Sequence, residues 1–89
     1  MTTSQFADLT ELRADVELDC SGLLCPLPVY RASLALSQLS PGQVLRLVTT
    51  DPGSLEDIPA LARQTGNTLL GAERHEDHQV FWIEKGTRA

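Results

Sequence analysis

The sequence predicts an α+β two-layer sandwich in which a four-stranded mixed sheet carries both helices on one face. Two observations support this prediction. Short stretches with strand periodicity and two longer stretches with helical periodicity follow one another in βαβαββ order, and turn-forming residues separate them. The chain has 89 residues, which is one domain, and a domain of this size buries about 60–65% of its unfolded surface.

The first two elements come directly from apolar spacing. A strand is expected over residues 14–19, where Val16 and Leu18 alternate with acidic residues. A helix is expected over residues 26–39, because apolar residues recur there every three or four positions. These residues are Val29, Ala32, Leu36 and Leu39. Pro41-Gly42 should end this helix.

The middle of the chain predicts a strand and a second helix. Residues 44–48 are almost continuously apolar, which favours a central strand buried on both faces. The helix should begin at Ser54, whose hydroxyl is a suitable cap, and should end at Gly66-Asn67. Its first turn is acidic and Pro59 lies near its start. Its inward residues are expected to be Ile58, Leu61, Ala62 and Thr65.

The last two strands are expected over residues 68–74 and 79–84, joined by the polar turn 75–78 as a hairpin. The domain therefore covers residues 14–86. Residues 1–13 form an N-terminal extension, and residues 87–89 form a C-terminal tail.

Charge and composition exclude several classes of function. The formal net charge is −5 at pH 7, and the seven Lys and Arg residues are scattered, so we expect no direct nucleic-acid binding. No apolar stretch approaches the roughly 20 residues of a membrane span. With two cysteines and no signal-peptide pattern, the expected location is cytoplasmic.

The most informative motif is Cys25-Pro26-Leu27-Pro28, at the start of the first helix. A helix N-terminus favours an anion, so Cys25 as the N-cap should have a thiol pKa below the reference of about 8.5. Pro26 would be the first helical residue, the Leu27 N–H would point toward sulfur, and Pro28 would remove a competing donor. We expect Cys25 to be a nucleophile that can hold a persulfide, although many free cysteines are only buried apolar residues.

Other residues near the motif have expected roles. Gly22, Asp51 and Pro52, together with Pro26 and Pro28, should shape the loops around the thiol, and the charge of Asp51 would raise the thiol pKa. Leu24, Leu27 and Arg31 are candidates for partner docking, while Arg31 could instead stabilise a sulfur anion or be a solvated surface residue.

Cys20 is interpreted as a buried core residue, with a resolving thiol and a secondary sulfur relay as alternatives. A disulfide with Cys25 would need their Cα atoms within about 7 Å. His75 and His78 suggest zinc, but their spacing from the cysteines is poor, so no metal site is expected.

From Leu18 to about Gly86 the chain resembles the TusA/SirA-like family of small sulfur-carrier proteins. The resemblance rests on the cysteine followed by Pro-x-Pro and on several shorter matches. These matches are Leu18-Asp19, Gly22-Leu23, Pro41-Gly42, Asp51-Pro52 and Asp57-Ile58-Pro59. Three positions depart from the family. Arg31 stands where Lys is frequent, and Ala62 and Asn67 stand where many relatives have Cys and His.

The resemblance implies a sulfurtransferase-type carrier. Cys25 would accept sulfane sulfur as a persulfide and pass it to a partner in tRNA thiolation, cofactor biosynthesis or sulfur oxidation. The implied partners are a donor, either a cysteine desulfurase or a rhodanese-like protein, and an acceptor protein, with no cofactor. Two alternatives stay open: a thiol redox switch using a Cys20–Cys25 disulfide, and a noncatalytic RNA-associated interaction module.

Overall fold

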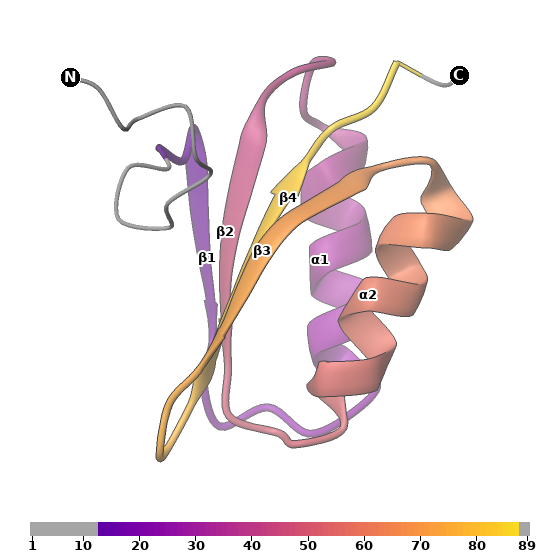
Figure 1. The fold of residues 1–89 in the computed structure, drawn as a ribbon. Coiled ribbons are helices and arrows are strands. Elements are labelled where there is room, and N and C mark those ends of the chain that lie inside the picture. The colour runs from indigo at the N-terminus through magenta and orange to yellow at the C-terminus, as the bar shows by residue number, and fades with distance from the viewer. Residues whose placement is uncertain (1–12, 88–89) are drawn as a thin grey trace, which may run out of the picture.

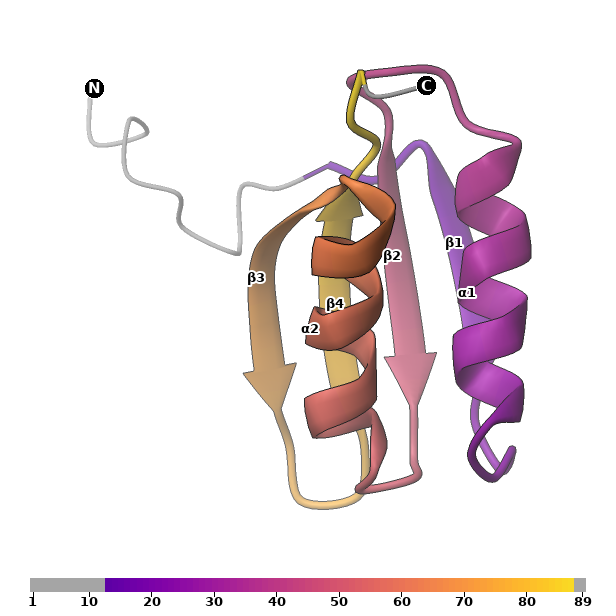
Figure 2. The same ribbon diagram turned by 90° about the vertical axis from the view of Figure 1, so that its right-hand side faces the viewer.

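The computed structural model describes residues 13–87, and it contains the predicted elements in the predicted order. The sheet has four strands in the order β1-β2-β4-β3. Both helices pack on the same face of this sheet (Figures 1 and 2). The elements are β1 (Val16–Cys20), α1 (Leu27–Ser37), β2 (Val44–Thr49), α2 (Ser54–Thr65), β3 (Thr68–Arg74) and β4 (Gln79–Glu84). The predicted two-layer α+β sandwich is confirmed.

Strand pairing places two loops together at one end of the sheet. β1 and β2 are parallel, with Leu18 opposite Leu47, whereas β4 is antiparallel to both β2 and β3. A parallel pair needs a crossover connection, which α1 supplies. The carboxyl ends of β1 and β2 therefore lie at the same edge, and each continues into a loop that leads to the start of a helix (Figure 1).

β2 occupies the predicted central position, but the prediction that both of its faces are buried is wrong. Leu45, Leu47 and Thr49 point toward the helices and are buried, while the residues between them are only partly buried. Both described helices cover the same side of the sheet (Figure 2). The second face of β2 therefore has no helix from residues 13–87 packed on it.

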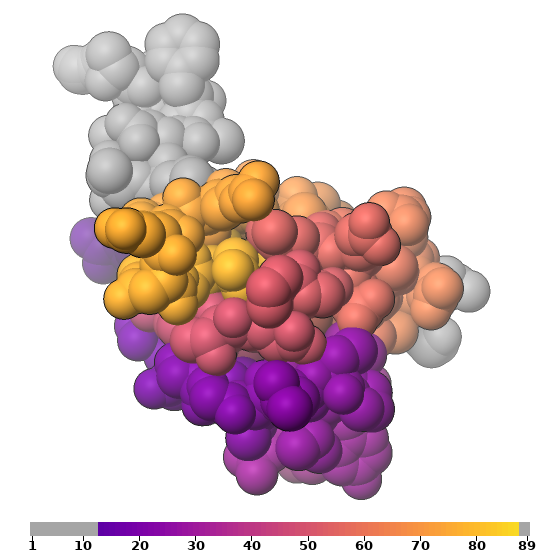
Figure 3. Space-filling view, turned by 90° about the horizontal axis from the view of Figure 1, so that it is seen from below, coloured from indigo at the N-terminus to yellow at the C-terminus, as the bar shows by residue number. Residues whose placement is uncertain are grey.

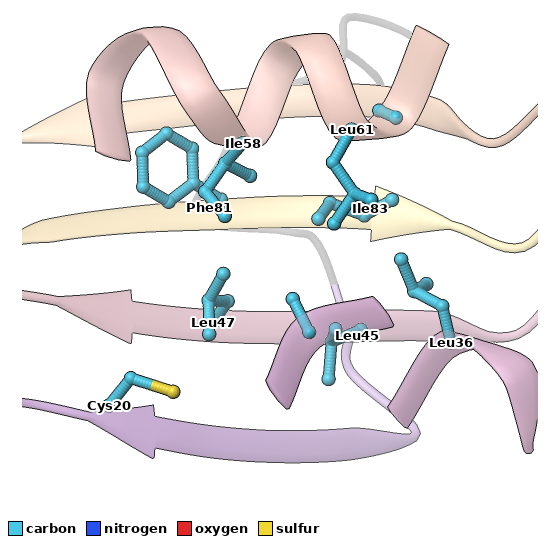
Figure 4. Close-up of a cluster of buried hydrophobic side chains, with 10 residues drawn as sticks. Cys20, Leu36, Leu45, Leu47, Ile58, Leu61, Phe81 and Ile83 are labelled. Atoms are coloured by element: carbon cyan, nitrogen blue, oxygen red, sulfur yellow. The ribbon is translucent and has the colours of Figure 1, made fainter. Parts of the chain in front are cut away.

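The hydrophobic core lies between the helices and the sheet (Figure 4). Each helix contributes from its inner face, with Leu36 from α1 and Ile58 from α2, and the sheet contributes mainly from β2 and β4. The buried cluster comprises Cys20, Ala32, Leu36, Leu45, Leu47, Ile58, Leu61, Ala62, Phe81 and Ile83. This packing anchors both helices, whose first turns form the site described below.

The helix ends differ in detail from the predictions. Gly53, not Ser54, is the N-cap of α2, and the buried Ser54 makes no capping side-chain bond. Thr65 is exposed, with its hydroxyl donating to the Leu61 carbonyl, so the prediction that it faces inward is wrong. Gly66 ends α2 as predicted, in a left-handed conformation with φ of 76°.

Two further findings concern the extent of the chain. In the part of the chain that the structure describes, no helix has both the length and the apolar character of a membrane span. The predicted extension, residues 1–13, lies outside the described residues apart from Arg13, and of the predicted tail only Thr87 is described. The domain boundaries therefore remain predictions.

Candidate functional site

The candidate site lies where the loop after β1 meets the loop after β2. Figure 3 views this end of the molecule, with the segment after β1 in purple directly beside the segment after β2 in rose. The Gly22 N–H donates to the Thr50 hydroxyl over 2.8 Å, and the Cys25 N–H donates to Oδ2 of Asp51 over 2.8 Å. Two hydrogen bonds therefore hold the cysteine loop against the neighbouring loop.

Asp51 links the cysteine loop to the start of α2. Besides accepting from Cys25, its carboxylate accepts from the Gly53 N–H over 3.3 Å, and its backbone carbonyl accepts from the Ser54 N–H over 3.0 Å. Pro52 follows on the exposed surface, and its carbonyl accepts from the Leu55 N–H. These contacts are what the expected loop-shaping role of Asp51 and Pro52 requires.

The backbone around Cys25 differs from the expected cap. Pro26, not Cys25, is the N-cap of α1, and the helix begins at Leu27. The Leu27 N–H donates to the Leu24 carbonyl over 2.9 Å, so the prediction that it points freely toward sulfur is wrong. The Cys25–Pro26 peptide bond is cis. Pro28 lies in the first turn of the helix and is buried.

The thiol of Cys25 is exposed and bonded to a carboxylate. It donates to Oδ2 of Asp57 over 2.8 Å, and this hydrogen bond is the main cause that raises the thiol pKa above its ordinary value. Desolvation and the charges of Asp57 and Asp51 raise it further. The predicted fall in pKa is therefore wrong, because ionisation would place a sulfur anion beside two carboxylates. The predicted direction of the Asp51 effect is confirmed.

A small cavity of about 300 Å³ adjoins the thiol between the starts of α1 and α2. One wall comes from the cysteine loop and α1, and the other from one face of α2. The lining residues are Cys25, Pro26, Val29, Asp57, Ala60, Leu61 and Gln64. Its walls are mostly apolar, and the Asp57 carboxylate lies at the sulfur.

The surface beside the thiol is apolar and open. Leu24 and Leu27, two predicted docking residues, have 71% and 46% of their surface exposed. Arg31 is also exposed, and its charge acts on Cys20. Tyr30 and Leu34 continue the surface along α1 with exposures of 67% and 54%. Sequence reasoning missed these two residues, although they lie at helical spacing outside the core stripe.

Cys20 is completely buried in the core (Figure 4). Burial is the main cause that raises the pKa of its thiol, the charge of Asp19 adds to this effect, and Arg31 opposes it. Both cysteines are free thiols in the structure. The interpretation of Cys20 as a core residue fits this burial, because its sulfur is packed inside the protein rather than presented at the surface with Cys25.

The histidines lie in the turn between β3 and β4, which projects to the side of the sheet opposite the helices (Figure 1). His75 pairs with Glu73 and His78 pairs with Asp77, and the two rings stack with centroids 4.5 Å apart. Between residues 13 and 87 no group of three or more His, Cys, Asp or Glu side chains could hold a metal ion.

Asp57 is the site residue that sequence reasoning did not identify. The sequence places it in the acidic first turn of a helix and within the Asp57-Ile58-Pro59 match, both of which fit its position in α2. Its contact with Cys25 joins residues 32 positions apart. The available signal was the Asp57-Ile58-Pro59 motif itself, which carries one titratable side chain.

Comparisons with known proteins agree on one family. The family described as Sulfurtransferase TusA matches residues 16–85. The sulfur carrier protein TusA of Allochromatium vinosum is 49% identical over 80% of this chain and 93% of its own length. The putative sulfur carrier protein YrkI of Bacillus subtilis is 37% identical over 84% of this chain and 100% of its own. A crystal structure of a SirA-like protein from Desulfitobacterium hafniense has a TM-score of 0.67 and 25% identity, covering 80% of this chain and 97% of that one.

Proposed function

Since this chain belongs to the TusA family of sulfurtransferases and is a sulfur carrier in a sulfur relay, we propose that Cys25 is the residue that carries the sulfur. The observation behind this proposal is the contrast between the two cysteines of the chain. The thiol of Cys25 is exposed at a surface with apolar neighbours, whereas Cys20 is 0% exposed. A carrier must bring its sulfur into contact with another protein, which a buried thiol does not do.

The transfer is an exchange between two cysteines. The Cys25 sulfur attacks the outer sulfur of a persulfide on the donor, a new sulfur–sulfur bond forms on Cys25, and the donor's own sulfur–sulfur bond breaks. The donor cysteine leaves as a thiol and Cys25 becomes the persulfide. Delivery to the acceptor repeats this exchange with Cys25 as the donor. No outside oxidant or cofactor enters, because one cysteine gains the sulfane sulfur that the other loses.

The partners are a sulfur donor, of the cysteine desulfurase or rhodanese-like kind, and a sulfur acceptor. Both dock on the surface around Cys25, through Leu24, Leu27, Arg31 and the Asp51-Pro52 loop. Exposed leucines at the edge of a site favour a partner with an apolar patch. The relay operates in the cytoplasm, where thiols are kept reduced.

Mass spectrometry of the loaded protein tests the proposal. Reduced protein is incubated with a cysteine desulfurase and cysteine, and peptide masses are measured for the wild type, Cys25→Ser and Cys20→Ala. A gain of one sulfur atom on the Cys25 peptide of the wild type and Cys20→Ala, and none in Cys25→Ser, supports the carrier role. A Cys20–Cys25 disulfide without any added sulfur would instead favour the redox switch.

A further inference from the structure

We propose that Asp57 is a catalytic residue of sulfur uptake, whose carboxylate accepts the thiol proton of Cys25 as the new sulfur–sulfur bond forms. The inference rests on the proposed function, because it takes Cys25 as the sulfur-accepting residue. Neither the motif around Cys25 nor its own helix start supplies this proton acceptor. The acceptor comes from the second helix, across the cavity beside the thiol.

The geometry of the contact is that of a proton donor and its acceptor. The Cys25 sulfur lies 2.8 Å from Oδ2 of Asp57, within the reach required of a general base. Asp57 is held in the first turn of α2, where its N–H donates to the Gly53 carbonyl over 3.0 Å, and Ile58, the next residue, is fully buried in the core. The position of the carboxylate is therefore set by a packed helix.

The charges around the thiol explain why a base is needed. The charged side chains on the elements around Cys25 are Asp51 in the loop, Glu56, Asp57 and Arg63 on α2, and Arg31 on α1, with Arg63 in the last turn of α2, away from the first turn that carries Asp57. Asp57 and Asp51 raise the thiol pKa, while Arg31 acts on Cys20. A free thiolate is thus disfavoured before a donor arrives. Transfer of the proton during the attack avoids this anion.

Sulfur uptake moves one proton and one sulfur atom between the two cysteines. The Cys25 sulfur uses a lone pair to bond the outer sulfur of the donor persulfide, and its proton passes to Oδ2 of Asp57. The donor's sulfur–sulfur bond breaks and its electron pair goes to the donor cysteine sulfur. That sulfur then takes the proton from the Asp57 carboxyl group, which restores the carboxylate. Cys25 is left as the persulfide and the donor cysteine as a thiol.

The Asp57 carboxylate should affect alkylation and sulfur uptake by Cys25 in opposite directions, although the two rates ordinarily increase together. A thiol held in the neutral form reacts slowly with alkylating agents, because the thiolate is the nucleophile. Sulfur uptake instead proceeds through the proton transfer to Asp57. Removal of the carboxylate charge should therefore speed alkylation and slow sulfur uptake, whereas a residue that only positions the loop would change both reactions in the same direction.

The experiment compares the wild type, Asp57→Asn, Asp57→Glu and Glu56→Gln, with circular dichroism as the check of folding. Glu56 is the matched control, since it is an exposed carboxylate on the same turn of α2. One arm measures the alkylation rate of Cys25 by iodoacetamide at neutral pH. The other measures sulfur uptake from glutathione persulfide, read as the mass gain of one sulfur atom on the Cys25 peptide.

The expected result has opposite signs in the two arms. Asp57→Asn should be alkylated several-fold faster and should take up sulfur about 10²-fold more slowly, the lower end of what a general base ordinarily contributes. Asp57→Glu should recover part of the uptake, and Glu56→Gln should match the wild type in both arms. Uptake by Asp57→Asn that equals or exceeds the wild type would overturn the inference and leave the carrier role standing.

Two further outcomes keep the test decisive. If the wild type gains no sulfur at Cys25, the proposed function fails and the inference falls with it. If Asp57→Asn does not fold, the pH dependence of the uptake and alkylation rates of the wild type tests the inference. The uptake rate is first corrected for the ionisation of glutathione persulfide. Uptake that falls with decreasing pH less steeply than alkylation supports proton transfer to Asp57, and parallel falls would refute it.

Discussion

The Cys25 sulfur and Oδ2 of Asp57 lie 2.8 Å apart although 32 positions separate the two residues in the chain. The contact exists because β1 and β2 are parallel neighbours, so that the loops after them reach the same edge of the sheet. It reverses the effect expected of a thiol at a helix start. The thiol is held protonated by a carboxylate rather than ionised by backbone N–H groups.

The first prediction concerns the titration of Cys25. Its alkylation rate should reach half of its maximum at a pH above that of an unfolded Cys-Pro-Leu-Pro peptide, because the Asp57 hydrogen bond and the nearby charges raise the thiol pKa. Asp51→Asn should move this midpoint down by less than Asp57→Asn does. The measurement is the iodoacetamide rate against pH, and a midpoint at or below the peptide value would contradict it.

The same raised pKa predicts a pH dependence of stability. The folded thiol ionises at a higher pH than the unfolded one, so its stabilising contribution is present below the unfolded pKa and is lost as the pH rises through the folded pKa. The free energy of unfolding of the wild type, measured with urea, should therefore decrease over this pH range more than that of Cys25→Ser. If the free energy of unfolding changes equally with pH in the two proteins, ionisation of the thiol is not coupled to folding.

Cys20 should affect stability and not sulfur uptake. Cys20→Ala removes one buried heavy atom from the core, at a cost of about 1 kcal/mol in the free energy of unfolding. Cys20→Ser should cost more, because its hydroxyl would be buried among apolar side chains. Chemical denaturation measures both costs. Loss of sulfur uptake by a folded Cys20→Ala protein would instead assign Cys20 a place in the relay.

Substitution of Gly22 should lower the stability of the fold because of its backbone conformation, without any steric clash of the new side chain. Its φ is +81°, and an added Cβ would meet nothing within 4 Å, so Gly22→Ala should cost about 1–2 kcal/mol of conformational strain. Gly22→Asn should cost less, since Asn tolerates this region. Gly53→Ala is the matched control, with φ of −60° and a nearest contact of 3.5 Å. Equal unfolding free energies for Gly22→Ala and Gly53→Ala would refute the prediction.

Substitutions on the apolar surface should impair docking of a protein donor without impairing the chemistry at Cys25. Leu27→Ser and Leu34→Ser should lower kcat/KM for sulfur transfer from a protein donor. Both side chains are exposed, Leu27 near Cys25 at the start of α1 and Leu34 farther along the same helix. Uptake from glutathione persulfide should not change, since this small donor needs no docking surface. Kinetics with the two donors, measured on the same preparations, check this. A parallel loss with both donors would indicate damage to the site itself.

Much of the fold follows from local pattern. Alternation over β1, helical spacing over α1 and the polar turn after β3 each depend on neighbours within a few positions, so their approximate bounds are readable from the sequence. The central position of β2 was also correctly predicted. Its half-buried second face was not, because a continuous apolar run reads the same whether one or both faces are covered.

The sequence by itself determined the order of the elements, the two-layer architecture and the exposed motif at Cys25. Only the tertiary structure decided the ionisation of that thiol. The capping pattern of Cys25-Pro26-Leu27-Pro28 is local, but the acceptor of the thiol proton is Asp57, which the pairing of β1 with β2 brings into contact. A pKa depends on the nearby charges in space, and the carboxylate bonded to the Cys25 sulfur belongs to a distant part of the chain.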